Sequence, residues 1–382
     1  MSPERSLRER VRSLIPTEGF VQLRIPGPTP IPDSVRQASA EQMINHRGPE
    51  FADLIAEVTQ GVKRFFETSQ DLLLLTASGT GALEAAIVNT LSPGDRVLSV
   101  TVGEFGDRFA EIARTYGADV VTLSFEPGHA ADPEAVGRAL ATDGPFKAVL
   151  LTQNETSTGV TNDVLAISRV VHETDALLLV DGISSISSIE MKADEWGCDV
   201  VLAGSQKGWM APPGISMVSM GPSAWDAYAA ARMPRYYWDL GRAKKSLQRL
   251  QTPATPAVSV LYALRASLRL LLAEGPENVF ERHRRCAAKI RAGVTALGLE
   301  LLADAAHASN TVTAVKVPRD LDGARLLRVL EQDGIVLANG QGSLAGKIFR
   351  IGHLGMIDDS DTVEILAGLA RALPLARVGS VH

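Results

Sequence analysis

The strongest constraint on the fold is a series of seven short apolar runs between residues 72 and 220, each long enough for one β-strand. Segments with helical periodicity, such as 106–116 and 133–141, separate most of them. Runs that are apolar throughout are typical of parallel strands buried on both faces, and their alternation with helices predicts an α/β fold. The predicted strands span residues 72–76, 96–102, 120–125, 148–153, 177–181, 200–203 and 215–220.

A lysine lies in the short turn between the last two of these strands, in the sequence Gly204-Ser205-Gln206-Lys207-Gly208. Because so short a connection cannot cross over a sheet, one of the two strands is predicted to be antiparallel. Desolvation in such a turn would lower the pKa of the amine, and a neutral amine can form a Schiff base with an aldehyde. Taken alone, the same turn also fits an ordinary surface lysine.

Two further motifs follow strands that precede this lysine. Asp181 ends the run 177–181, where ligands of parallel sheets bind, although a helix N-cap would explain it as well. Ser78, Gly79 and Thr80 open a helix of small residues after the run 72–76, and free amides at a helix start bind phosphate. A phosphate cradle, a carboxylate for a pyridine nitrogen and an amine for an aldehyde are the groups that pyridoxal phosphate requires.

With these motifs the chain resembles the class V (subgroup IV) pyridoxal-phosphate-dependent aminotransferases, in their alanine–glyoxylate and serine–glyoxylate branch. The resemblance runs from residues 23–30 to the motif Phe349-Arg350-Ile351-Gly352, and so covers nearly the whole chain. It implies an α/β fold-type-I transferase with a mostly parallel seven-stranded sheet and a smaller C-terminal α/β domain. The expected domains are an N-terminal segment 1–25 packing on the small domain, a large cofactor-binding domain 26–255 and a small domain 256–382.

The resemblance also implies the roles of individual residues. Lys207 is expected to bind the cofactor as a Schiff base and to act as the catalytic base, and Asp181 to contact the pyridine nitrogen. Gly27 and Arg350 are expected to hold the substrate. The cofactor-binding residues are expected to be Ser78, Gly79, Thr80, Phe105, Thr158, Asp181, Gln206, Lys207 and, from the neighbouring subunit, Thr252.

The chain departs from the family pattern at two of these places. Phe105 stands where the family often has a tryptophan. Phenylalanine offers the cofactor ring a smaller aromatic face than tryptophan does. Arg249 stands three residues before Thr252, where the family often has an aromatic hydroxyl. An arginine there could bind phosphate as well.

The implied enzyme is a homodimeric transaminase that moves the amino group of alanine or serine to a 2-oxo acid, expected to be glyoxylate, by a ping-pong Schiff-base mechanism. Aspartate stays open as the donor, because Arg47 or Arg249 could bind its second carboxylate. A desulfurase or another lyase is disfavoured, since no cysteine follows Cys286. A non-catalytic subunit is also disfavoured, because it would not need Lys207 and Asp181 together.

The composition points away from several other classes of protein. The chain has 382 residues, of which 45% are hydrophobic, so it is long enough for two domains. A net charge of −6 disfavours a nucleic-acid partner. The two cysteines give neither a disulfide framework nor a zinc cluster, so we expect no metal and a cytoplasmic location. No apolar run is long enough to cross a membrane.

After residue 222 the pattern changes. Residues 239–245 are predicted as a charged loop, and 258–272 and 277–297 as two long helices. Two Thr-Pro pairs between residues 252 and 256 indicate a rigid loop. The C-terminal part is predicted to contain strands at 310–317 and 347–351 and helices at 323–332 and 361–373.

Overall fold

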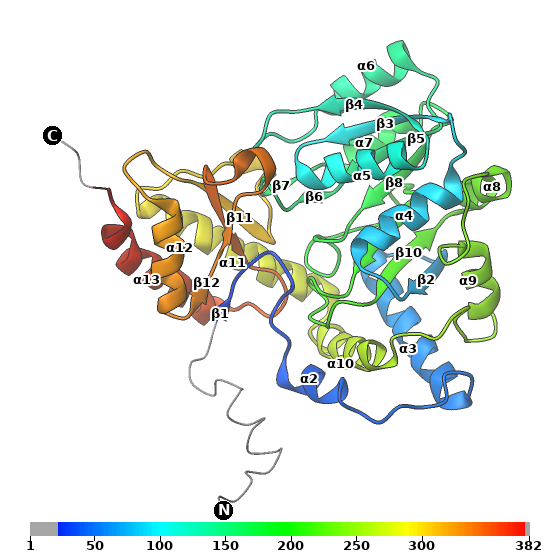
Figure 1. Ribbon diagram of the computed structural model, residues 1–382, viewed down its shortest axis with the longest axis horizontal. Helices are drawn as coiled ribbons and strands as arrows, with labels where there is room; N and C mark the ends of the chain where they lie inside the picture. Colours follow the sequence, from blue (N-terminus) through cyan, green and yellow to red (C-terminus); the bar gives the residue numbers. More distant parts are fainter. Residues whose placement is uncertain (1–21, 379–382) are drawn as a thin grey trace, which may run out of the picture.

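The computed structural model describes residues 22–378, which form a large α/β unit and a smaller C-terminal unit beside it (Figure 1). Most of the expected N-terminal segment 1–25 therefore lies outside the described residues. Its last part forms strand β1, Gln22–Leu23, which pairs in parallel with β12, Ile335–Val336, of the smaller unit.

The large unit is built on a seven-stranded sheet in the order β2-β10-β9-β8-β5-β3-β4. Strand β10 runs antiparallel to both of its neighbours, and the other paired strands are parallel, which confirms the mostly parallel sheet and the one reversed strand. The strands are β2 Asp71–Leu75, β3 Arg96–Thr101, β4 Asp119–Ser124, β5 Ala148–Thr152, β8 Leu177–Asp181, β9 Val200–Gly204 and β10 Ser216–Met220.

Helices cover both faces of this sheet, because successive apolar residues of each strand point to opposite sides. In β8, for example, Leu178 and Val180 belong to one buried cluster, while Leu177 and Leu179 belong to the other. The first cluster is completed by helices α3 Pro49–Phe66, α6 Pro133–Asp143, α7 Val164–Val171 and α10 Val258–Glu274. The second is completed by α4 Gly79–Thr90, α5 Glu104–Thr115, α8 Pro222–Ala230 and α9 Leu240–Leu247.

The smaller unit has its own apolar core around a three-stranded antiparallel sheet in the order β11-β14-β13. Its elements are β11 Val312–Lys316, β13 Ala338–Asn339, β14 Ile348–Gly352, α11 Pro276–Ala296, α12 Gly323–Gln332 and α13 Asp359–Ala376. Helix α10 contributes to the core of the large unit, and α11 to that of the small one. The domain boundary at residues 255 and 256 stays a prediction.

Short elements complete the chain: α2 Asp33–Ala38, the hairpin β6 Asn154–Glu155 with β7 Val160–Thr161, and the 3₁₀ turns Ala305–His307 and Gly342–Leu344. The prediction of a loop at 239–245 is wrong, because α9 begins there. The Asp239 side chain caps this helix by accepting from the amide of Arg242, and Leu240 and Ala243 bury one face of it. The charged residues of the segment occupy the other positions of an amphipathic helix.

None of the helices within residues 22–378 is long and apolar enough to cross a lipid bilayer.

Candidate active site

Lys207 and Asp181 lie together beyond the carboxyl ends of adjacent parallel strands, since Asp181 ends β8 and Lys207 follows β9. The Asp181 side chain is buried and the Lys207 side chain is partly buried. Burial lowers the pKa of the Lys207 amine to about 8, although the Asp181 carboxylate opposes this shift. Burial raises the pKa of Asp181 to about 7, and the amide of Ile183, which donates to Oδ1 over 2.8 Å, partly offsets the effect. At neutral pH the site therefore holds an amine and a carboxylate that both exchange protons readily.

The proline-rich segment after β1 crosses directly over this lysine. Lys207 Nζ donates a hydrogen bond of 2.7 Å to the carbonyl oxygen of Pro26. A side chain on Gly27 would begin only 2.7 Å from Cδ and 2.8 Å from Nζ of Lys207, and the φ angle of Gly27 is +119°. Glycine is required here for both reasons, and it leaves room above the amine.

Ser78, Gly79 and Thr80 form the start of α4, as predicted. Ser78 is the N-cap residue, but its side chain makes no capping hydrogen bond. The Gln206 side chain lies beside this turn: a Cβ atom built on Gly204 would be 3.1 Å from Gln206 Oε1 and 3.5 Å from the amide nitrogen of Gly79. Gln206 Oε1 is buried and has no hydrogen-bond partner among the described residues. The free amides at the start of α4 can donate to an anion, and the Nε2 group of Gln206 is a further donor beside them.

Two other predicted residues come from loops at the same edge of the sheet. The hydroxyl of Thr158, in the β6–β7 hairpin, is buried and lacks a partner within residues 22–378, so it is available to a ligand. Phe105 is half-buried in the first turn of α5, and the guanidinium carbon of Arg108 lies 4.8 Å from its ring centroid. Arg108 also acts electrostatically on Asp181 and Lys207.

Glu155 is a buried carboxylate of this region that sequence reasoning missed. One of its oxygens accepts from the amides of Phe105 and Gly106, each over 3.1 Å. The other accepts from the amide and the hydroxyl of Ser157, over 3.0 and 2.6 Å. Glu155 thereby ties the β6–β7 hairpin to the start of α5. An acidic residue in the polar stretch after a buried strand was the available signal.

Arg350 lies in the middle of β14 and is 6% exposed. Its hydrogen bonds go to three neutral acceptors, the carbonyl oxygens of Asn339 and Thr156 and the side chain of Gln341. Thr156 belongs to the large unit and Asn339 to the small one, so the guanidinium lies where the two units meet. A buried cation without an ion pair can receive a carboxylate.

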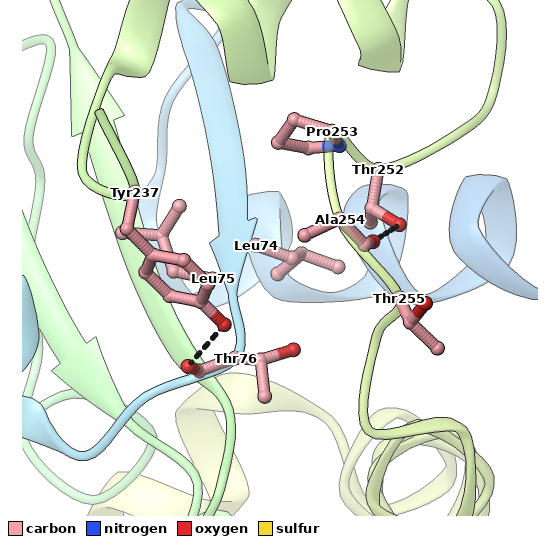
Figure 2. A pocket seen from close by; sticks show the side chains of 8 residues that line it. All are labelled: Leu74, Leu75, Thr76, Tyr237, Thr252, Pro253, Ala254 and Thr255. Atoms are coloured by element: carbon pink, nitrogen blue, oxygen red, sulfur yellow. Dashed lines mark hydrogen bonds between the residues drawn. The ribbon is translucent and has the colours of Figure 1, made fainter.

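The structure does not bring Thr252 to the other site residues within one chain. Its hydroxyl donates to the carbonyl oxygen of Ala254 over 2.7 Å, and its own carbonyl accepts from Arg47 over 2.6 Å. Figure 2 shows residues 252–255 on one side of the end of β2 and Tyr237 on the other, around a small pocket. The predicted role of Thr252 in a neighbouring subunit's site remains a prediction.

Comparisons with known proteins identify the family of the chain. The model of the class-V aminotransferase family matches residues 28–363. The 42 kDa subunit of a soluble hydrogenase from Anabaena cylindrica is 43% identical over 91% of this chain and 92% of its own length. The L-aspartate–glyoxylate aminotransferase of Paracoccus denitrificans is 40% identical over 91% of this chain and 89% of its own. Further relatives at 36% and 38% identity are serine–glyoxylate aminotransferases.

Among solved structures, the alanine–glyoxylate aminotransferase of Nostoc sp. superposes with a TM-score of 0.90 at 30% identity, over 96% of this chain and 100% of the other. The expected fold is therefore confirmed. The chain belongs to the class-V aminotransferase family and is a pyridoxal-phosphate-dependent aminotransferase.

Proposed function

We propose that this enzyme moves the amino group of alanine or serine to glyoxylate, with pyridoxal phosphate bound covalently to Lys207. The observation that carries the proposal is the pair formed by the partly buried Lys207 and the buried Asp181 at the carboxyl edge of the sheet. An amine with a pKa of about 8 has a substantial neutral fraction at physiological pH, and only the neutral form attacks an aldehyde.

The residues around this pair fit the cofactor. The free amides of the turn Ser78-Gly79-Thr80 would hold its phosphate, and the Gln206 side chain beside this turn would donate to it through Nε2. The free hydroxyl of Thr158 would bind the phenolic oxygen, and Asp181 the pyridine nitrogen. Phe105 would contact the ring. When bound, the cofactor supplies an electron sink that makes the Cα–H bond of the donor acidic.

The chain's own side chains then position the substrate and move its proton. Arg350 would hold the α-carboxylate through Nη2, since Nε and Nη1 already donate to protein acceptors, and this contact would orient the Cα–H bond. Lys207 Nζ would take the proton from Cα of the donor as general base and deliver it to the cofactor within the same half-reaction. In the second half-reaction it would move a proton in the opposite direction, to Cα of the product formed from the 2-oxo acid. The backbone at Gly27 would close the site above the amine, where a larger residue would collide with it.

The acceptor is supported by the relatives, whose names differ in the donor but share glyoxylate. Serine is the donor in the name of one relative, and alanine is the donor in the name of the Nostoc structure. Aspartate is a second candidate donor, because the Paracoccus relative is an aspartate–glyoxylate aminotransferase. Arg47 and the exposed Arg249 are the cations that could bind the extra carboxylate.

A panel of single half-reactions tests this proposal. Purified holoenzyme is mixed with alanine, serine or aspartate, and the loss of the visible absorbance of the bound cofactor is followed. We expect alanine or serine to react fastest and glyoxylate to restore the spectrum. Lys207→Ala should fold but show no turnover. Sustained turnover by this variant, without added amine, would remove Lys207 from the mechanism.

We also propose a cytoplasmic homodimer with shared sites. The exposed aromatic side chains of Tyr236 and Tyr237, next to the loop of Thr252, support a subunit contact there, since large apolar surface is enriched at interfaces.

A further inference from the structure

Three neutral acceptors hold Arg350 in place, and their importance rests on the proposed role of Arg350 as the substrate-carboxylate ligand. The guanidinium is held by Nε donating to the carbonyl oxygen of Asn339 over 2.9 Å. Nη1 donates to the carbonyl oxygen of Thr156 over 3.2 Å and to Oε1 of Gln341 over 2.9 Å. Gln341 is the one side chain among these partners.

The charge of Arg350 is left unpaired by this arrangement. No carboxylate forms a salt bridge with it in the part of the chain that the structure describes. Glu155 acts on Arg350 electrostatically, but both of its oxygens are taken up by amides and a hydroxyl. A buried cation that is oriented but not neutralised keeps its affinity for an incoming anion.

Gln341 is held in place by the loop that carries it, between β13 and β14. Asn339 Oδ1 accepts from the amides of Gly340 and Gly346, over 2.8 and 3.1 Å, which closes the loop on itself. Gly342 has a φ of +49° and lies against Glu104 in the first turn of α5, so closely that a Cβ atom would collide with that carboxylate. The loop therefore packs on the large unit, and the Gln341 amide has a defined position.

We infer that Gln341 is a positioning residue for substrate binding, whose neutral amide fixes the Arg350 fork without consuming its charge. A carboxylate at the same position would form an ion pair with Arg350 and compete with the α-carboxylate of every amino acid and 2-oxo acid. A shorter apolar residue would leave the charge free but the fork less well fixed. The neutrality of residue 341 thus matters as much as its hydrogen bond.

Steady-state kinetics of Gln341→Glu test this inference. We expect KM to rise about tenfold or more for both donor and acceptor, with kcat little changed at saturation. Ser343→Glu is the matched control, because it adds the same charge to an exposed position of the same loop. It should leave KM unchanged.

The outcomes separate this inference from the proposed function. If Arg350→Lys leaves KM unchanged, the carboxylate role of Arg350 fails. If Arg350→Lys raises KM while Gln341→Glu does not, only the inference on Gln341 fails. A rise in KM of equal size in Ser343→Glu also overturns it. Should Gln341→Glu not fold, Gln341→Ala decides, since an unchanged KM in that variant contradicts a positioning role.

Discussion

At the scale of single residues, the site depends on groups whose pKa values burial has shifted from their ordinary range. Asp181 is 3% exposed and accepts one backbone amide, so its charged form is poorly solvated. Burial raises its pKa to about 7 in the folded chain, against about 3.9 for an unfolded one. The folded state thus binds the Asp181 proton more tightly than the unfolded state does. This proton binding stabilises the folded state at low pH, and the stabilisation is lost as the pH rises through about 7.

Asp181→Asn is therefore expected to change stability and activity in opposite directions. The apoprotein of the variant should be more stable at pH 8 by an amount on the order of 2 kcal/mol, because residue 181 then carries no buried charge. The difference should shrink toward pH 4. Transamination should slow by orders of magnitude, since the carboxylate no longer keeps the pyridine nitrogen protonated.

Denaturant unfolding of the apoproteins at the two pH values, with turnover of the holoenzymes, measures both effects. An unchanged turnover in Asp181→Asn would remove Asp181 from the site. Equal stability of the two apoproteins at pH 8 would contradict the raised pKa.

Local sequence predicts some of these residues and not others. Lys207, Asp181 and Ser78 follow buried strands, and parallel strands bring their carboxyl ends to one edge, so the apolar runs alone place them together. Glu155 also follows a buried strand, but its partners and those of Gln341 could not be predicted in this way. Glu155 meets Phe105, which lies 50 residues away, only through tertiary packing. Gln341 lies nine residues from Arg350, and the two meet because β13 and β14 pair.

At the scale of elements, α9 also shows the difference between what local sequence predicts and what tertiary packing decides. Its sequence contains adjacent charges that indicate a loop, but the side chains of Leu240 and Ala243 bury one face against the large core. Tertiary burial decides such short amphipathic segments more than local composition does. The long, regular elements α11 and α12, by contrast, lie within two residues of their predicted bounds.

The junction between the β6–β7 hairpin and α5 allows a test at this scale. Glu155→Gln replaces one accepting oxygen by an amide group that cannot accept, so two buried donors lose their partner. We expect a loss of stability of about 1–3 kcal/mol for each unsatisfied group. Hydrogen exchange should also show weaker protection in the hairpin or in the first turn of α5.

Ser157→Ala is the comparison variant. It removes a hydroxyl that donates to Glu155 and accepts from the amide of Glu104, so one amide of α5 loses its acceptor, but Glu155 keeps the amides of Phe105 and Gly106. It should lower stability less than Glu155→Gln does. If Glu155→Gln were as stable as the parent chain, with unchanged exchange, the anchoring of α5 by this carboxylate would be refuted.

At the scale of the whole molecule, Thr252 is the predicted site residue that one chain does not bring to the site. Its loop lies beside the end of β2, with its hydroxyl satisfied by Ala254 and its backbone held by Arg47. A rigid loop at the surface, close to exposed aromatic side chains, can complete the site of a second copy across a two-fold axis.

Mixed dimers decide whether the sites are shared. Thr252→Glu should inactivate the dimer by placing a negative charge against the cofactor phosphate of the neighbouring subunit, and Lys207→Ala removes the amine. A heterodimer of the two variants would combine both defects in one site and leave the other intact. With random mixing, about a quarter of all sites should be active if each site takes Lys207 from one chain and Thr252 from the other. If each chain built its own site, no intact site would exist, so heterodimers shown to form but lacking activity would exclude sharing through Thr252.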